Sequence, residues 1–385
     1  MQQGLFVAAA VASWTLAAVW TWRSARGLIA SRRYPRVSTC EAEAGAPLAS
    51  ILVPARNEEA NIAECLERLL AQKYPRFEVI AVDDNSTDRT GELIAEAARR
   101  DPRLVALSAT PTPPGWTGKN WALEAAAQRA RGEWLLFTDA DTRHGPYALS
   151  SSLAHASSRG LDFLSLVPRA LNGSFWEGVL QPPALGCLGQ WFPLDRINDP
   201  RDPVAFANGQ FLLLRREAYQ ALGGHAGVRG EYLEDVAFAR AAKRSGRKME
   251  CALGKRLLGV RMYDSLRRYF RGWHRIYLHS FDRSWPLLMG KALDLALFSV
   301  LPFVLVAVLP ALGPPSGGPR LLWLSALAAS LMAVFHLYLF AAKVHSTMGS
   351  PRGFAIFHPL ATVVVLGILL TAVRSAITGA PTRWR

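Results

Sequence analysis

Cysteine is scarce in this chain of 385 residues, which contains four cysteines and no pair with the Cys-x-x-Cys spacing. Zinc sites and disulfide-stabilised domains need closely spaced pairs or larger numbers of cysteines. The sequence therefore argues against a metal or disulfide role for Cys40, Cys65, Cys187 and Cys251. Low-complexity tracts and repeats of the solenoid or propeller type are also lacking, which excludes repeat architectures.

Positively charged residues are absent ahead of the first long hydrophobic run, residues 4–22, whereas five arginines follow it within 23–36. A secretory signal peptide carries its positive charge before the apolar stretch, and positive residues mark the cytoplasmic flank of a membrane helix. We therefore expect residues 1–36 to form an uncleaved N-terminal anchor with a basic flank. The N-terminus is expected outside a plasma membrane of the bacterial inner-membrane type, and the following domain in the cytosol.

A basic excess is lacking in the middle of the chain, although the whole carries a net charge of +14. Residues 37–254 contain 24 basic and 27 acidic residues, whereas 255–283 contain eight Lys and Arg against two Asp. Basic residues concentrated beside membrane segments indicate contact with anionic lipids. We expect membrane lipids and no nucleic acid among the partners, with residues 255–285 forming a basic interfacial segment.

Three more apolar runs have the roughly 17–25 residues that a membrane-spanning helix needs. They cover residues 295–312, 321–342 and 354–373. The sequence predicts a C-terminal transmembrane region over 286–373, of about three helices, and a basic tail over 374–385. Three spans place the tail outside, against the positive-inside trend, whereas a re-entrant 287–312 with Pro302 and Pro310 leaves it cytosolic. We expect three spans because of their length, and the alternative stays open.

Between residues 48 and 254, short apolar segments alternate with helical patterns. Strands are expected at 50–54, 77–82, 103–107, 133–138 and 205–214. Four helices are expected. The first covers about 58–71, the second ends at about Arg100, the third begins at about Lys119, and the fourth covers about 233–244. Strands that alternate with helices at this spacing form a parallel sheet with right-handed crossovers. We therefore predict an α/β domain over 48–254.

Acidic residues follow two of the expected strands directly. Asp83 and Asp84 open an acidic turn over 83–88, and Asp139 and Asp141 follow the strand at 133–138. In open α/β sheets, ligands bind beyond the carboxyl ends of the strands. We therefore expect these carboxylates to lie at the same edge of the sheet.

Asp139 and Asp141 present two carboxylates at alternate positions. Hard cations such as Mg²⁺ and Mn²⁺ take oxygen ligands, and a diphosphate supplies the remaining ones. Such a metal neutralises charge on a departing nucleoside diphosphate. The pattern predicts a divalent metal cofactor at Asp139 and Asp141, although paired aspartates also occur in solvated turns.

Glu234 and Asp235 begin a predicted helix and have two interpretations. Carboxylates stabilise a helix N-terminus electrostatically, and a carboxylate also serves as a general base toward an acceptor hydroxyl. The residues alone leave both open. Lys119 lies at another helix start, where it either contacts a phosphate or is a surface residue. The stretch from Gly115 to Asn120 is no P-loop, because Ser or Thr does not follow the lysine.

Residues 174–192 are rich in Phe, Trp and Leu and are interrupted by Pro182-Pro183. They form either part of a core or an interfacial segment that helps a lipid acceptor to enter.

Five motifs occur along the chain in a fixed order. They are Val53-Pro-Ala-Arg-Asn-Glu58, Asp83-Asp-Asn-Ser-Thr-Asp88, Asp139-Ala-Asp141, Gly209-Gln-Phe-Leu-Leu-Leu-Arg215 and Leu233-Glu-Asp235. On these motifs, residues 48–275 resemble the family-2 glycosyltransferases of the GT-A (Rossmann-like) fold. Gly115-Trp-Thr-Gly-Lys-Asn-Trp121 and the C-terminal apolar runs are similar to the hopene-associated and carotenoid (diaponeurosporenoate-type) branch.

The resemblance implies an inverting transfer of one sugar from a nucleotide-sugar, by analogy a UDP-sugar, to a lipid acceptor such as a carotenoid or hopanoid. It implies that the donor is bound by Pro54, Ala55, Glu58, Asp83, Asp84, Lys119 and Asp139. By the same analogy the metal is bound by Asp139 and Asp141. Asp235 becomes the catalytic base, with Glu234 as the second catalytic candidate.

One departure from the family pattern concerns polymer formation. Processive members carry Gln/Arg-x-x-Arg-Trp, whereas here Gly272 separates Arg271 from Trp273. This favours transfer of a single sugar. Arg271 and Trp273 either border the acceptor site or anchor an interfacial helix.

Two other functions stay open. A processive polysaccharide synthase needs a translocating channel with more spanning helices. In a membrane transporter or scaffold, Lys291 and Asp294 would line a transport path. Both lie near the start of their apolar segment, however, where long charged side chains usually reach toward the membrane interface. The sugar, the acceptor and the oligomeric state are left undetermined.

Overall fold

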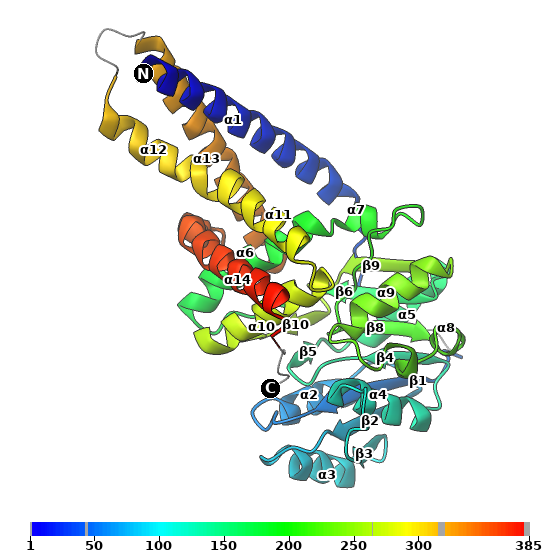
Figure 1. The fold of residues 1–385 in the computed structure, drawn as a ribbon. Coiled ribbons are helices and arrows are strands. Elements are labelled where there is room, and N and C mark those ends of the chain that lie inside the picture. Colours follow the sequence, from blue (N-terminus) through cyan, green and yellow to red (C-terminus); the bar gives the residue numbers. More distant parts are fainter. Residues whose placement is uncertain (1, 43–44, 264, 315–319, 381–385) are drawn as a thin grey trace. The chain divides into compact units, whose positions relative to one another are not determined.

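The computed structural model describes residues 2–42, 45–263, 265–314 and 320–380, and its internal contacts divide it into two compact units (Figure 1). The sheet unit consists of Tyr34–Leu171 and Trp191–Met262. The helical unit consists of Met1–Arg33, Asn172–Gln190 and Tyr263–Arg385. Residues 172–190, inside the predicted 48–254 domain, therefore group with the helical unit. Of the predicted basic tail, residues 381–385 lie outside the described part.

A seven-stranded mixed sheet forms the centre of the sheet unit, in the order β3-β2-β1-β4-β8-β6-β9. Its strands are β1 (Ala49–Ala55), β2 (Phe77–Asp83), β3 (Leu104–Ser108), β4 (Trp134–Phe137), β6 (Phe163–Val167), β8 (Leu212–Arg215) and β9 (Met249–Leu253). Strands β3, β2, β1 and β4 are parallel, as predicted. The expectation of a wholly parallel sheet is wrong at β8, which runs antiparallel to β4 and β6. The chain begins β8 at the carboxyl edge of β4, where the Gln210 carbonyl accepts from Thr138, and so must run back.

The central strands are apolar on both faces because helices cover both. Ile51 and Val53 of β1 are fully buried in a core that also contains residues of α2, α3 and α5. Leu52 is fully buried in a second core with residues of α4 and α9. Such continuous apolar runs are typical of strands buried on two sides. The helices of this unit are α2 (Ile62–Leu70), α3 (Thr90–Arg100), α4 (Gly118–Arg129), α5 (Ala148–Ser158), α7 (Leu194–Ile197), α8 (Arg216–Ala221), η1 (His225–Val228) and α9 (Glu234–Arg244).

The predicted starts of one helix and one strand are wrong, because the residues at these starts form turns instead. Helix α2 begins at Ile62 rather than near Glu58, since the amides of Asn61 and Ile62 both donate to the Glu58 carbonyl. Strand β8 begins at Leu212 rather than at residue 205, since Phe211 closes a turn onto Asn208.

A second, three-stranded sheet was not expected from the sequence. Its order is β5-β10-β7, formed by Thr142–His144, Leu258–Val260 and Arg169–Ala170. Strand β10 takes part of the predicted interfacial segment 255–285 into the sheet unit.

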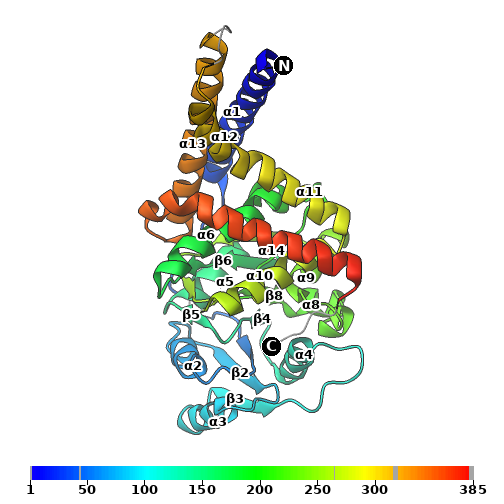
Figure 2. The same cartoon turned by 60° about the vertical axis from the view of Figure 1, so that its left-hand side comes forward.

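The helical unit contains seven α-helices in its described part, with short irregular turns between some of them. They are α1 (Gln2–Arg33), α6 (Phe175–Trp191), α10 (Leu266–Ser280), α11 (Trp285–Leu295), α12 (Leu301–Leu312), α13 (Arg320–Met348) and α14 (His358–Thr378). A π-helical turn, η2 (Ala296–Val300), joins α11 to α12, and a 3₁₀ turn, η3 (Arg352–Phe357), precedes α14. Helices α1, α12 and α13 lie side by side, and α14 lies along α10 and α11 (Figures 1 and 2).

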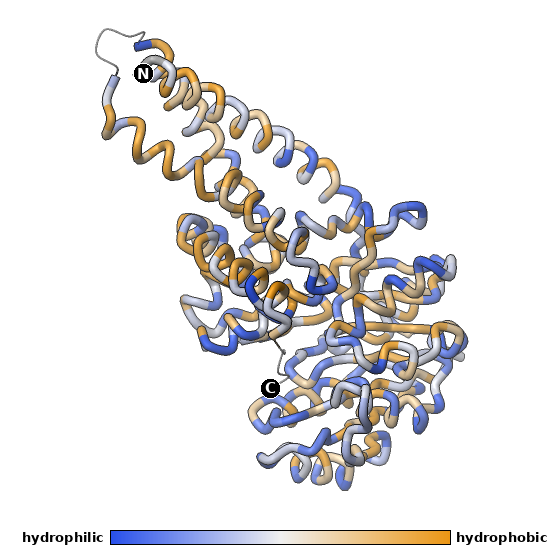
Figure 3. The backbone as a smooth tube through the Cα atoms, viewed as in Figure 1, coloured by the Kyte–Doolittle hydropathy of each residue, from blue (hydrophilic) through white to orange (hydrophobic). Residues whose placement is uncertain are grey.

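Four helical stretches of the described chain are long and apolar enough to cross a membrane. They are Gly4–Arg33, Trp285–Leu312, Arg320–Met348 and Arg352–Thr378. Their hydrophobic character is visible along α12, α13 and α14 (Figure 3). Each predicted apolar run lies within one of them. The stretch Trp285–Leu312 is 28 residues long, so Pro302 and the π-helical turn are accommodated in a helix of spanning length.

Helix α6 runs without a break through the two prolines that interrupt the apolar stretch in the sequence. Pro182 and Pro183 lie inside the helix and are buried. Prolines remove two backbone donors and usually kink or break a helix. Here α10 supports the neighbouring turns, since the Tyr269 hydroxyl donates to the Leu180 carbonyl (2.9 Å) and the Tyr277 hydroxyl to the Ala184 carbonyl (3.0 Å).

The aromatic residues of α10 differ in burial: Phe270 is 41% exposed, and the other three are buried. Tyr269, Trp273 and Tyr277 are buried in the helical unit, and Trp273 donates through Nε1 to Gln181 Oε1 at 3.1 Å. Arg271, on the same helix, is exposed. Aromatic tips that find acceptors on a neighbouring helix stabilise packing, which leaves the basic residues for the outer face.

The charged residues near the start of the Trp285–Leu312 stretch both have partners. Asp294 Oδ1 pairs with Arg23 Nη2 of α1 at 2.5 Å, and the Arg23 guanidinium lies over the Phe298 ring. Lys291 Nζ lies over the Phe281 ring. These contacts join helices and give no support to a transport path.

Candidate active site

The candidate active site begins where β1 and β2 end side by side. Pro54 and Ala55 are the last residues of β1, and Asp83 ends β2. The amide of Asp84 donates to the Ala55 carbonyl at 2.8 Å. The parallel pairing of these strands therefore brings the predicted donor-binding residues of both to one edge of the sheet.

Polar contacts fasten the loop after β1 to the acidic turn after β2. Asn57, whose φ is 54°, accepts through Oδ1 from the Thr87 amide at 2.8 Å. The amide of Glu58 donates to Thr90 Oγ1 at 2.8 Å, and Glu58 Oε2 accepts from Asn61 Nδ2. The two loops thus form one fixed polar surface that includes Glu58.

Asp84 lies beneath this surface and is 2% exposed. Burial is the largest influence on this carboxyl and raises its pKa, against the lowering effects of Asn85 and of Arg56, whose Nη1 lies 3.6 Å away. Gly118, the first residue of α4, is so close that an added Cβ would lie 2.4 Å from Asp84 Oδ2. A glycine at this position therefore lets α4 begin directly against the carboxylate.

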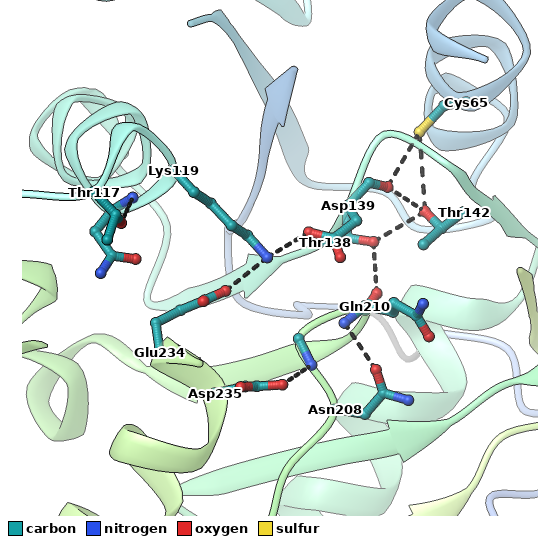
Figure 4. A network of polar contacts seen from close by, with 12 residues as sticks. Cys65, Thr117, Lys119, Thr138, Asp139, Thr142, Asn208, Gln210, Glu234 and Asp235 are labelled. Carbon is teal, nitrogen blue, oxygen red and sulfur yellow. Dashed lines mark hydrogen bonds and ion pairs between the residues drawn. The ribbon is translucent and has the colours of Figure 1, made fainter. Parts of the chain in front are cut away.

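Lys119 connects two of the predicted site residues. Its Nζ lies 2.6 Å from Asp139 Oδ1 and 2.7 Å from Glu234 Oε1 (Figure 4). Desolvation lowers the pKa of Lys119, but the charges of Asp139 and Glu234 outweigh it and raise the pKa overall. The surface interpretation of Lys119 is wrong, because its side chain is only 12% exposed.

The turn that carries Asp139 and Asp141 is held by hydroxyl groups. Thr138 Oγ1 donates to the Gln210 carbonyl at 2.8 Å and lies 2.9 Å from His144 Nε2. Thr142 Oγ1 donates to the Asp139 carbonyl at 2.7 Å. Complete burial lowers the pKa of His144 to about 3, so its ring is neutral here.

The donor set at this turn fits a hard divalent cation that also binds a diphosphate. Asp139 and Asp141 contribute carboxylate oxygens, the ligands that Mg²⁺ and Mn²⁺ prefer. In the part of the chain that the structure describes, no group of three or more His, Cys, Asp or Glu is arranged to bind a metal. A cation held by the two aspartates therefore needs further oxygen ligands from the donor.

Asp235 lies in the first turn of α9 and is oriented from two sides. Its Oδ2 accepts from the Gly209 amide at 2.7 Å and its Oδ1 from the Val236 amide at 2.8 Å. Desolvation, followed by the charge of Glu234, raises the pKa of Asp235 to about 7. A general base is most effective when its pKa is near the working pH. The alternative that the two carboxylates stabilise the helix start stays open, because both lie in the first turn of α9, after the N-cap residue Leu233.

The sheet unit thus brings together the predicted residues at the ends of β1, β2 and β4, with Lys119 and the start of α9. Arg271 and Trp273 belong to the helical unit. Three residues that the sequence did not indicate support the site through hydrogen bonds: Asn120, Thr138 and His144. Asn120 stands in the noted Gly115–Trp121 stretch, whereas His144 gave no signal because its short strand was not predicted.

Cys40, Cys65, Cys187 and Cys251 are free cysteines in the structure. Cys65 packs below the site, and burial raises the pKa of its thiol to about 12. A neutral thiol of this kind contributes packing.

Comparisons with known proteins agree with this geometry. Residues 50–223 match the profile described as Glycosyl transferase family 2. A beta-monoglucosyldiacylglycerol synthase from Nostoc sp. is 31% identical over 205 residues, which are 52% of this chain and 42% of that protein. A 4,4'-diaponeurosporenoate glycosyltransferase from Staphylococcus haemolyticus is 25% identical over 230 residues, 58% of this chain and 59% of that protein. The chain spans about half the length of these curated relatives.

A solved structure resembles the chain along its whole length. It is a mannosyltransferase from Pyrobaculum calidifontis in complex with GDP-Man and Mn²⁺, 18% identical with a TM-score of 0.52. The match covers 99% of this chain and 100% of that one. At this identity the likeness shows the fold, and the predicted GT-A-type α/β fold is confirmed.

Proposed function

We propose that this protein, whose residues 50–223 match the glycosyl transferase family 2 profile, transfers one sugar from a nucleotide-sugar to a lipid acceptor at a membrane. The position of Asp235 carries the proposal. This carboxylate is partly buried, oriented by the Gly209 amide, and next to Glu234, which pairs with Lys119. Lys119 also pairs with Asp139, so the candidate base and the candidate donor-binding carboxylate share one network.

The proposed reaction is a single displacement with inversion. Asp235 accepts the proton of the acceptor hydroxyl or carboxyl group while the acceptor oxygen bonds to the anomeric carbon of the sugar. The bond between that carbon and the diphosphate oxygen breaks, and the nucleoside diphosphate leaves. The raised pKa of Asp235 suits this step, because a carboxylate of low pKa is a weak base.

The donor is proposed to lie across the carboxyl edge of β1, β2 and β4. Pro54, Ala55, Glu58, Asp83 and Asp84 are proposed to bind the base and ribose of a UDP-sugar. Lys119 and Asp139 are proposed to face the diphosphate. A divalent cation held by Asp139 and Asp141 would stabilise charge on the departing diphosphate. The Mn²⁺ in the mannosyltransferase of the same fold supports this cofactor.

The acceptor is proposed to be an apolar lipid with a hydroxyl or carboxyl group, such as a carotenoid, a hopanoid or a diacylglycerol. Two observations support a lipid: the four candidate membrane spans, and the names of the two relatives. We propose that the sheet unit faces the cytosol from a plasma membrane. Arg271, exposed on α10, stays a candidate acceptor contact, whereas buried Trp273 is proposed to support the packing of α10.

Membranes that contain the full chain, incubated with radiolabelled UDP-sugars and Mg²⁺ or Mn²⁺, test the proposal. We expect label in the butanol phase when products are partitioned between butanol and water. Membranes with the Asp235→Asn variant are the matched control and should give little label in butanol. Mass spectrometry of the labelled lipid then identifies the acceptor.

Two results would count against parts of this proposal. Undiminished transfer in excess chelator would contradict the metal at Asp139 and Asp141. Label found in a long water-soluble polymer, with none in butanol, would favour a polysaccharide synthase.

A further inference from the structure

The first turn of α4 is fastened to a distant loop through Asn120. The Asn120 side chain is completely buried, and its Nδ2 donates to three carbonyls of that loop. The distances are 2.8 Å to Val228, 3.0 Å to Glu231 and 3.2 Å to Arg229. The Thr117 amide adds a bond to the Arg229 carbonyl at 2.8 Å. A neutral amide with both hydrogens directed at carbonyls suits this position, whereas a carboxylate would repel them.

This loop leads within a few residues to the candidate base. Residues 228–231 are followed by Tyr232 and Leu233, and α9 then begins with Glu234 and Asp235. Leu233 is the N-cap residue, and its side chain has no group that accepts a hydrogen bond. The position of the α9 start therefore depends on how the preceding loop is held.

We propose that Asn120 is a positioning residue for Asp235. By holding loop 228–231, it fixes the start of α9 against the helix that carries Lys119. The inference rests on the proposed function, in which Asp235 is the base. A base must lie within about 2.6–3.2 Å of the proton that it takes. A displacement of roughly 1 Å lowers the rate about 10²-fold.

Kinetics of Asn120→Ala in the full-length protein provide the first test, with Asn198→Ala as the matched control. Asn198 also fastens backbone, through bonds of 2.9 and 2.7 Å to Cys251 on the edge strand β9. We expect Asn120→Ala to lower kcat about 30-fold or more and to change the donor KM less than about threefold. Asn198→Ala should keep kcat near that of the wild type. A kcat within about threefold of the wild type in Asn120→Ala, or an equal loss in the control, would overturn the inference.

A double-variant cycle separates positioning from an independent effect. If Asn120 acts through Asp235, the Asn120→Ala/Asp235→Asn protein should be no slower than Asp235→Asn alone. A further loss as large as that of Asn120→Ala by itself would mean that Asn120 acts by another route.

Hydrogen exchange tests the fastening without reference to any reaction. We expect backbone amides of residues 228–236 to exchange about tenfold or more faster in Asn120→Ala, with no change in β9. Unchanged exchange in 228–236 would refute the fastening. Faster exchange, combined with no sugar transfer by the wild-type protein, would refute the proposed function while the fastening stands.

Discussion

Glu234 and Asp235 are neighbours at one helix start, yet their carboxylates have different partners. Glu234 Oε1 pairs with Lys119 Nζ at 2.7 Å, whereas Asp235 accepts from two backbone amides. The lysine occupies an oxygen of Glu234, while neutral amides orient the Asp235 carboxylate without neutralising it. This difference at the residue scale favours Asp235 over Glu234 as the group that takes a proton.

Replacement of Asp235 by asparagine should lower kcat about 10²-fold or more and leave nucleotide affinity nearly unchanged, because an amide keeps the shape but cannot accept the proton.

In the wild type, kcat/KM should rise with pH through about 7, because the raised pKa of Asp235 leaves the base protonated at lower pH. Steady-state kinetics over roughly pH 5.5 to 8.5, which brackets the pKa of Asp235, check both expectations.

Glu234→Gln is the matched comparison for this prediction. If Glu234→Gln removes the rise in rate near pH 7 while Asp235→Asn keeps it, then Glu234 is the base.

At the element scale, the first turn of α4 meets three parts of the site with three consecutive residues. Gly118 lies against Asp84, Lys119 bridges Asp139 and Glu234, and Asn120 holds loop 228–231. Thr117 caps this turn by accepting from the Asn120 amide at 3.2 Å. Successive residues of a helix start point in different directions, so one short motif can reach three places.

Gly118→Ala should raise the donor KM about tenfold, because an added Cβ would lie 2.4 Å from Asp84 Oδ2 and displace a carboxylate proposed to bind the nucleotide. The melting temperature should fall little, since alanine is favoured over glycine in a helix by about 1 kcal/mol. Isothermal titration with UDP and a thermal melt measure the two effects.

Gly290→Ala in α11 is the control for this change, because nothing lies within 4 Å of its added Cβ. An unchanged UDP affinity in Gly118→Ala would show that Asp84 does not contact the nucleotide.

At the scale of the whole molecule, the chain returns several times to each of its two compact units. Helix α1 and the C-terminal helices belong to the helical unit, although more than 200 residues separate Arg23 from Asp294. Their ion pair is part-buried, and Trp20 of α1 also donates to the Phe298 carbonyl. Polar contacts between membrane helices stabilise a particular arrangement because few competing partners are available in an apolar setting.

Arg23→Asp should destabilise the helical unit, since two acidic side chains would then face each other. The double variant Arg23→Asp/Asp294→Arg should recover at least half of the loss. Thermal melts of full-length protein in detergent measure this loss. A loss of about 1 kcal/mol lowers the melting temperature of a small domain by roughly 4–8 °C and that of a larger domain by less. Arg32→Asp, an exposed position on the same helix, is the charge-matched control. Equal losses in the single variant, the double variant and the control would show that the pair does not join these helices.

Much of the fold and the membrane pattern followed from the sequence. Strands β2 and β4, which lead to Asp83 and Asp139, were predictable because a buried strand is a short apolar run and this pattern is local. The four candidate spans were predictable because a hydrophobic stretch of sufficient length is itself the signal. The motif residues that resemble family 2 indicated the chemistry, since each lies close to a strand or helix end.

Tertiary structure alone decided which groups share a network. Lys119, Asp139 and Glu234 are far apart in sequence, and their ion pairs depend on how α4 and α9 pack on the same face of the sheet. The reversal of β8, the continuity of α6 through two prolines and the fastening by Asn120 likewise depend on contacts across long separations. Local patterns carry no information on such contacts, because their energy comes from partners that only the folded chain brings together.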